Sequence, residues 1–274
     1  MSELPLNILR SIGKYEPIET DGLTLYPIRV ENYYEFLAAK PALDFMQQSL
    51  PIQLMSIPLL DAYFLIDTGQ VEGMKPTGLF MSACLLMSLA LRLMPHGTIE
   101  EQIKKLTPVA DPKNPNKLKG LKFIKNGEEV VIITPIQFQR LRPIIAAQNG
   151  IELMRDTANP ELVQAERDLA ETKAPKLDFE LDSLVTAAAI TSGAKEEEIY
   201  NWAILKLTNR LAAVKRMMDY MSCAIGESQG AKWKGGNPVP HPWFNRTKEE
   251  ITGLVAIEDF AGGQGVSAIK DATG

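Results

Sequence analysis

Histidine and cysteine are the side chains that most often bind metal ions or act as nucleophiles, and this chain has two of each. A zinc site needs ligands that share one helix face, and neither His96 nor His241 has a second ligand at helical spacing. Cys84 lies in the most apolar stretch, where a thiolate would be costly, and Cys223 ends an apolar helical pattern. We therefore expect surface or capping histidines and packed cysteines, with neither a metal site nor a nucleophilic site.

Glycine-rich stretches and acidic runs are the other patterns that could carry chemistry. Residues 234–237 (KGGN) and 262–265 (GGQG) lack the GxxxxGK[ST] spacing with which backbone amides and a lysine bind phosphates. The acidic runs at 100–101, 128–129 and 196–198 fall at turns or in the first turn of a predicted helix, which favours capping and solvation. No G-x-S-x-G motif is present. The residues thus predict a protein that is not an enzyme and needs no cofactor.

Composition sets the broad class. The chain has 274 residues and 30.3 kDa, with 45% hydrophobic and 23% charged residues, so it can bury a core. A net charge of −5 and an isoelectric point near 5.3 argue against binding to nucleic acid. Two cysteines without a CxxC motif are typical of a reducing compartment.

A helix-turn-helix pattern spans 181–191, a turn at 192–194 and a helix from Lys195. In such a unit the start of the second helix would face DNA, but here it carries Glu196, Glu197 and Glu198, which phosphates repel. We interpret the helix pair as scaffolding.

The most apolar stretch, 79–91 (LFMSACLLMSLAL), is too short for a membrane span. It has about 13 residues, and a spanning helix needs about 20. The first residues show no secretory signal pattern. We expect a soluble protein in which 79–94 is a buried core helix, with an oligomer interface as the alternative.

Strand signals lie at two places. Residues 23–30 alternate after an Asp-Gly turn, and Pro27 restricts them to an edge strand. Residues 121–125 and 128–133 flank Asn126-Gly127, the strongest short hairpin signal. The proline- and asparagine-rich segment 107–120 predicts a loop and a domain boundary.

Helical patterns fill most of the remaining chain. A helix opens at 31–32 and is interrupted at Pro41, and proline breaks divide 42–68. Thr134-Pro135 begins a helix that ends at Asn149-Gly150, and another helix starts at Asn159-Pro160. A small-residue helix ends at Ser192-Gly193, and one long helix then follows. The apolar stripe of that long helix is Ile199, Ala203, Leu207, Leu211, Val214, Met218 and Met221.

These elements predict a mostly helical α+β protein with short N-terminal strands, one β-hairpin, bundle-like helix packing and an extended C-terminal arm. The expected parts are 1–115, mostly helical, 116–226, a hairpin plus helices, and 227–274, the arm. The arm holds eight glycines and two of the three tryptophans. Tryptophans on such an arm dock onto their own chain or onto a partner.

Four groups of segments resemble small proteins encoded near the tape-measure gene in the tail-morphogenesis regions of phages and prophages of Gram-positive bacteria. The segments are 22–28 (GLTLYPI) with 33–37 (YYEFL), 133–150, 177–202, and 234–238 (KGGNP) with 243–244 (WF). Such proteins are described as tail assembly chaperones or baseplate-associated components. The resemblance implies a non-enzymatic protein of the host cytoplasm that binds tape-measure or tail-tube protein during assembly.

The resemblance leaves alternatives open. One is a structural baseplate or tail subunit that stays in the virion tail, and another is an enzyme with an unrecognised site. Self-association is also open, and we expect no nucleic-acid or membrane partner. For the clustered methionines, ordinary core packing is the alternative to an adaptable binding surface. The candidate partner-binding residues are Tyr33, Tyr34, Trp202, Met218, Trp233, Trp243 and Phe244.

Overall fold

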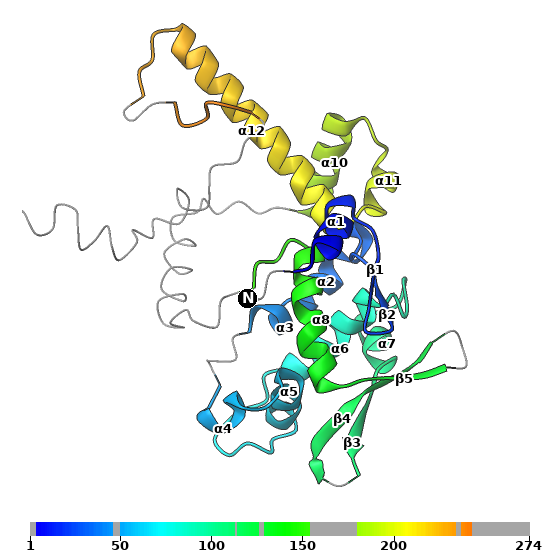
Figure 1. Ribbon diagram of the computed structural model, residues 1–274. Helices are drawn as coiled ribbons and strands as arrows, with labels where there is room; N and C mark the ends of the chain where they lie inside the picture. The colour runs from blue at the N-terminus through cyan, green and yellow to red at the C-terminus, as the bar shows by residue number, and fades with distance from the viewer. Residues whose placement is uncertain are drawn as a thin grey trace, which may run out of the picture. The chain divides into compact units, whose positions relative to one another are not determined.

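The computed structural model describes residues 4–45, 50–112, 114–125, 129–153, 180–233 and 237–242. The fold is α+β and mainly helical, which confirms the expected class (Figure 1). The chain forms two compact units, Met1–Leu211 and Ala212–Gly274, and each is described separately. The expected division into three parts stays a prediction.

The first unit begins with helix α1 (Leu6–Lys14) and a hairpin of β1 (Ile18–Thr20) and β2 (Leu23–Leu25). Both residues of the two-residue turn, Asp21 and Gly22, have positive φ, as the matching turn type requires. The strand expected over 23–30 is therefore wrong in extent, because it ends at Leu25. From Tyr26 the chain leaves the sheet and makes other backbone hydrogen bonds.

Short helices follow, and prolines separate them as expected. They are η1 (Val30–Asn32), α2 (Tyr33–Ala39), α3 (Pro41–Asp44), α4 (Ile52–Met55), α5 (Leu59–Asp67) and α6 (Leu79–Ala90). Nearly every side chain of α6 is buried, and α2, α3, α5 and α7 (Ile99–Lys104) pack around it. The prediction of a buried core helix is confirmed, although the helix ends at Ala90 and does not reach residue 94.

A second sheet contains β3 (Thr107–Asp111), β4 (Asn114–Lys125) and β5 (Glu129–Ile133), all antiparallel, in the order β3-β4-β5. The hairpin is confirmed, since Lys125 pairs with Glu129, whereas its Asn-Gly turn lies outside the described residues. The loop expected over 107–120 is wrong. Pro108 is tolerated because it lies on β3, an edge strand whose register shifts around Ala110.

Helix α8 (Pro135–Gln148) crosses the first unit and begins and ends as expected. Thr134 and Gln137 form a capping box at its start, and Gly150 at its end has a φ of +73°. The expected helix from Asn159 lies outside the described residues.

The long C-terminal helix is interrupted, which corrects the expectation of one helix from Lys195. After α10 (Leu181–Ser192) comes α11 (Glu196–Tyr200), and three residues separate it from α12 (Ile204–Ser228). The break occurs because the backbone there bonds to the N-terminal half: Val30 N donates to Trp202 O and Ile204 N donates to Ile28 O, each at 2.9 Å. Because Trp202 O and Ile204 N are used in these two bonds, they are not available for the hydrogen bonds of a continuous helix.

The second unit begins within α12. At the end of this helix Ala231 N donates to Gly226 O at 2.9 Å, and Asn237 Nδ2 donates to Glu227 Oε1 at 2.9 Å. The described part of the expected arm therefore folds back onto the helix end. The end of the arm, with Trp243 and Phe244, lies outside the described residues.

Asn149 joins the end of α8 to the segment after β2. Its Oδ1 accepts from Ile28 N at 3.0 Å and its Nδ2 donates to Ile145 O at 2.8 Å, and the side chain is buried. We expect Asn149→Ala to lower the free energy of unfolding by about 1–3 kcal/mol, because it leaves buried groups without partners. Urea denaturation measures this. The exposed Asn209→Ala variant, which loses only a bond to Tyr15, should change stability by less than about 0.5 kcal/mol. Equal effects of the two substitutions would contradict the role of Asn149.

Candidate functional site

The two cysteines are buried, as expected. Cys84 is 2% exposed within α6, and burial raises the pKa of its thiol from 9.0 to about 12. A thiolate at this position is strongly disfavoured. His96 and His241 are exposed, and within the described part of the chain no group of three or more His, Cys, Asp or Glu side chains could hold a metal ion.

Asp61 is the one buried carboxylate among the described residues. Burial raises its pKa, while its Oδ1 accepts a hydrogen bond from Leu118 N at 3.1 Å. The carboxylate thus ties α5 to strand β4, and this structural contact accounts for its burial.

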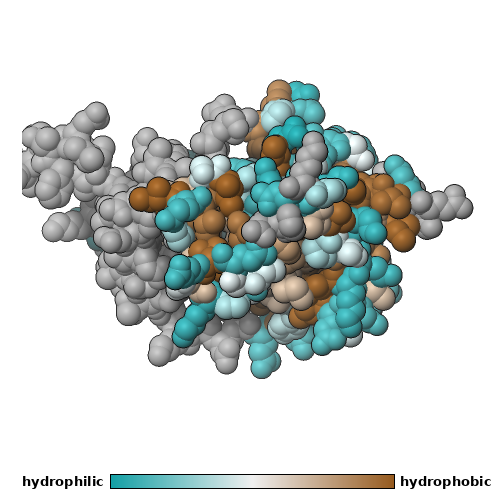
Figure 2. Space-filling view, turned by 90° about the horizontal axis from the view of Figure 1, so that it is seen from below, coloured by the Kyte–Doolittle hydropathy of each residue, from teal (hydrophilic) through white to brown (hydrophobic). Residues whose placement is uncertain are grey.

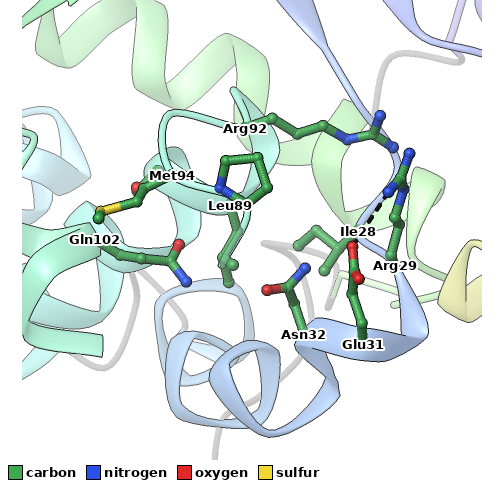
Figure 3. A pocket seen from close by; sticks show the side chains of 10 residues that line it. Ile28, Arg29, Glu31, Asn32, Leu89, Arg92, Met94 and Gln102 are labelled. Carbon is green, nitrogen blue, oxygen red and sulfur yellow. Dashed lines mark hydrogen bonds and ion pairs between the residues drawn. The ribbon is translucent and has the colours of Figure 1, made fainter. Parts of the chain in front are cut away.

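A cavity of about 140 Å³ opens beside η1, between the end of α6 and the start of α7 (Figure 3). Its lining comes from two segments, residues 28–32 and residues 88–102, and combines polar side chains with apolar ones such as Leu89 and Met94. The polar lining residues are Arg29, Glu31, Asn32, Ser88, Arg92 and Gln102.

Two arginines meet at one end of this cavity. Arg29 Nη1 lies 3.2 Å from Glu31 Oε1 and 3.2 Å from Asn201 Oδ1. Arg92 stacks on the Tyr26 ring at 4.5 Å from its centroid. Burial, together with the charge of Arg29, lowers the pKa of Arg92 below its ordinary value. Figure 3 shows the arginines and Glu31 at one end of the lining and Gln102 at the other.

The expected partner-binding residues of the first unit lie near one another. Tyr33 and Tyr34 make an edge contact with their ring centroids 5.8 Å apart, and Tyr34 is exposed. Tyr33 and Trp202 pack against the smaller core cluster formed with α10 and α11. The Trp202 ring also lies 4.3 Å from Lys206 Nζ. These contacts give Tyr33 and Trp202 a packing role.

Two expected residues of the second unit, Met218 and Trp233, belong to a set of exposed apolar side chains that we call the α12 stripe. It comprises Met218, Met221, Ile225 and Trp233, with exposed fractions of 64%, 55%, 55% and 40%. The first three are spaced by three and four residues and so share one helix face. A Cβ added at Gly226 would lie 3.6 Å from Trp233 Cζ2, so the indole rests against the helix.

Sequence reasoning found part of these sites. It named Met218 and Trp233, but it missed Ile225, although this residue continues the period of Met218 and Met221. It also missed the cavity, since no local pattern connects Asn32, Arg92 and Gln102. The only local signal was that Arg92 follows a strongly apolar helix.

On the face seen in Figure 2, hydrophobic residues form separate patches between hydrophilic ones. No helix among the described residues has the length and apolarity needed to cross a membrane. Comparison of the chain with family models, with curated proteins and with solved structures finds no match.

The raised pKa of Cys84 makes stability depend on alkaline pH. The unfolded chain releases the thiol proton near pH 9 but the folded chain only near pH 12, so the folded state holds more protons in between. Unfolding should therefore become easier by up to about 1.4 kcal/mol per pH unit over this window. Urea denaturation from pH 8 to 11 should show a shallower decline for Cys84→Ala than for Cys223→Ala. If the free energy of unfolding fell equally steeply with pH in both variants, the raised pKa of Cys84 would be contradicted.

Proposed function

We propose that this chain is a non-enzymatic protein of phage tail morphogenesis that acts as an assembly chaperone for the tape-measure or tail-tube protein. The observation that carries the proposal is the α12 stripe, in which three exposed apolar side chains share one face of a long helix and Trp233 rests against the end of that helix. The segment resemblance to tail-morphogenesis proteins supports the choice of partner.

The chemistry of the stripe suits transient binding of an apolar segment. Methionine is unbranched and polarisable, so Met218 and Met221 can repack around different surfaces. Trp233 adds a large rigid anchor, of the kind enriched at interface centres. An ion pair between Lys215 and Asp219, 2.9 Å apart, supplies polar character on the same helix. A chaperone that must release its client benefits from such adaptable contacts.

A charge placed on the stripe should abolish partner binding. We expect Met221→Glu to reduce recovery of the co-expressed tape-measure or tail-tube protein of the same phage at least about tenfold, because burying an unpaired carboxylate is costly. Stability should change by less than about 0.5 kcal/mol, since the side chain is exposed. The measurement is an affinity pull-down with the tagged full chain.

The matched control is Ile190→Glu on α10, where the side chain is 79% exposed and lies outside the stripe. This variant should capture as much partner as the unchanged chain. Equal loss in both variants would show that the stripe is not the binding surface.

A structural tail or baseplate subunit is the second candidate function. The glycine-rich sequence after residue 230 favours it, because such an arm can anchor a subunit to its neighbours. Mass spectrometry of purified particles separates the two. A chaperone should be missing from the particles and should bind its client in lysate. Recovery of the chain at fixed stoichiometry in the particles would overturn the chaperone role.

A further inference from the structure

The cavity beside η1 carries an excess of positive charge. Arg29 is neutralised by Glu31 at 3.2 Å, whereas Arg92 has no carboxylate within ion-pair distance among the described residues. The guanidinium of Arg92 donates to Pro27 O at 3.3 Å and lies over the Tyr26 ring. Because a guanidinium has five N–H donors, most of its capacity is left for another acceptor.

The backbone at Arg92 is held in a conformation that favours glycine. Its φ is +50°, and the hydrogen bonds Arg92 N to Leu89 O and Leu93 N to Ser88 O close the end of α6 as a Schellman motif. Glycine is the usual residue at this point of the motif. An arginine here costs conformational energy, and strain of this kind clusters at binding sites.

Two further groups in the lining lack partners. Ser88 and Gln102 are fully buried, and neither Ser88 Oγ nor Gln102 Oε1 has a hydrogen-bond partner among the described residues. Gln102 Nε2 is already bound to Gly97 O at 3.1 Å, which orients the amide. A buried acceptor without a donor is costly, so Gln102 Oε1 is placed to accept a hydrogen bond from a hydroxyl, an ammonium group or a water molecule in the cavity.

We propose that this cavity binds a small linear carboxylate, with the carboxylate at Arg92 and a hydrogen-bond donor at the other end of the molecule directed to Gln102. Arg29, Glu31 and Arg92 together carry a net charge of +1, and the single negative charge of a bound carboxylate would bring it to zero. A cavity of about 150 Å³ admits a molecule of about six non-hydrogen atoms, and the volume here is about 140 Å³. The inference does not depend on the proposed role in tail assembly.

The carboxylate can come from a free small acid or from a glutamate side chain of a protein. Both sources are tested by ¹H–¹⁵N NMR titration of the full chain in chloride-free, low-salt buffer. One arm adds glycolate, 3-hydroxypropionate and 4-hydroxybutyrate, with butyrate and 4-hydroxybutyramide as controls. The other arm adds the peptide acetyl-Gly-Glu-Gly-amide, and its control is acetyl-Gly-Gln-Gly-amide, which lacks the carboxylate. The signals followed are the side-chain amides of Asn32 and Gln102.

Saturable shifts with a hydroxy acid, together with weaker binding of butyrate and 4-hydroxybutyramide than of 4-hydroxybutyrate, would identify a free acid as the ligand. Saturable shifts with the Glu peptide alone would assign a protein side chain. Absence of saturable shifts in both arms would overturn the proposal and leave water as the occupant. The proposal would also be overturned if 4-hydroxybutyramide bound as tightly as 4-hydroxybutyrate.

Two variants test the assigned contacts. Arg92→Gly should fold, because glycine relieves the positive φ, and should lower affinity at least about tenfold through loss of a charge-assisted contact. Arg140→Gln, which removes a charge from an exposed site on α8, should leave affinity unchanged. Gln102→Met should remove the preference for 4-hydroxybutyrate over butyrate. Unaltered affinity in Arg92→Gly, or an unaltered preference in Gln102→Met, would contradict the assignment.

Discussion

The segment Tyr26–Val30 lies outside both sheets with Pro27, Ile28 and Val30 buried, and its backbone hydrogen bonds hold the first unit together. Buried N–H and C=O groups must find partners, and here they find them in three distant parts of the chain. Tyr26 N donates to Ala90 O at 2.8 Å at the end of α6, and Ile28 N donates to the Asn149 side chain. The 202–204 segment supplies the third set.

Helix α8 contributes to the same network through side chains. Gln148 Nε2 donates to Leu25 O at 3.2 Å, just before the buried segment. Arg142 Nε donates to Ala42 O at 3.1 Å, and Arg142 Nη2 donates to Leu43 O and Phe45 O. These carbonyls lie at the C-terminal end of α3, where a cation stabilises the helix end. One helix from the middle of the chain thus completes hydrogen bonds in two N-terminal segments, which is why residues about 100 apart share a core.

Local chemistry explains which features could be predicted from the sequence. The capping box at Thr134, the Asn-Gly hairpin and the helix breaks at prolines depend on neighbouring residues only. The break between α11 and α12 could not be predicted, because residues 196–221 have an unbroken apolar period and the interruption comes from backbone bonds to residues 28 and 30. The cavity was equally hidden, since its polar residues meet only after α6, α7 and η1 have packed.

The cavity and the α12 stripe follow from different physical constraints. Around the cavity, a fixed backbone segment places Arg29 and Asn32, and a strained residue places Arg92, so the polar groups are oriented before anything binds. Such preorganisation favours a small ligand with directional hydrogen bonds. The stripe has apolar side chains with freely rotating bonds and no fixed geometry beyond the helix. Apolar contacts are non-directional, so the stripe favours a larger and less exactly defined surface. A single chain can therefore hold a selective polar site and an adaptable apolar one without either constraining the other.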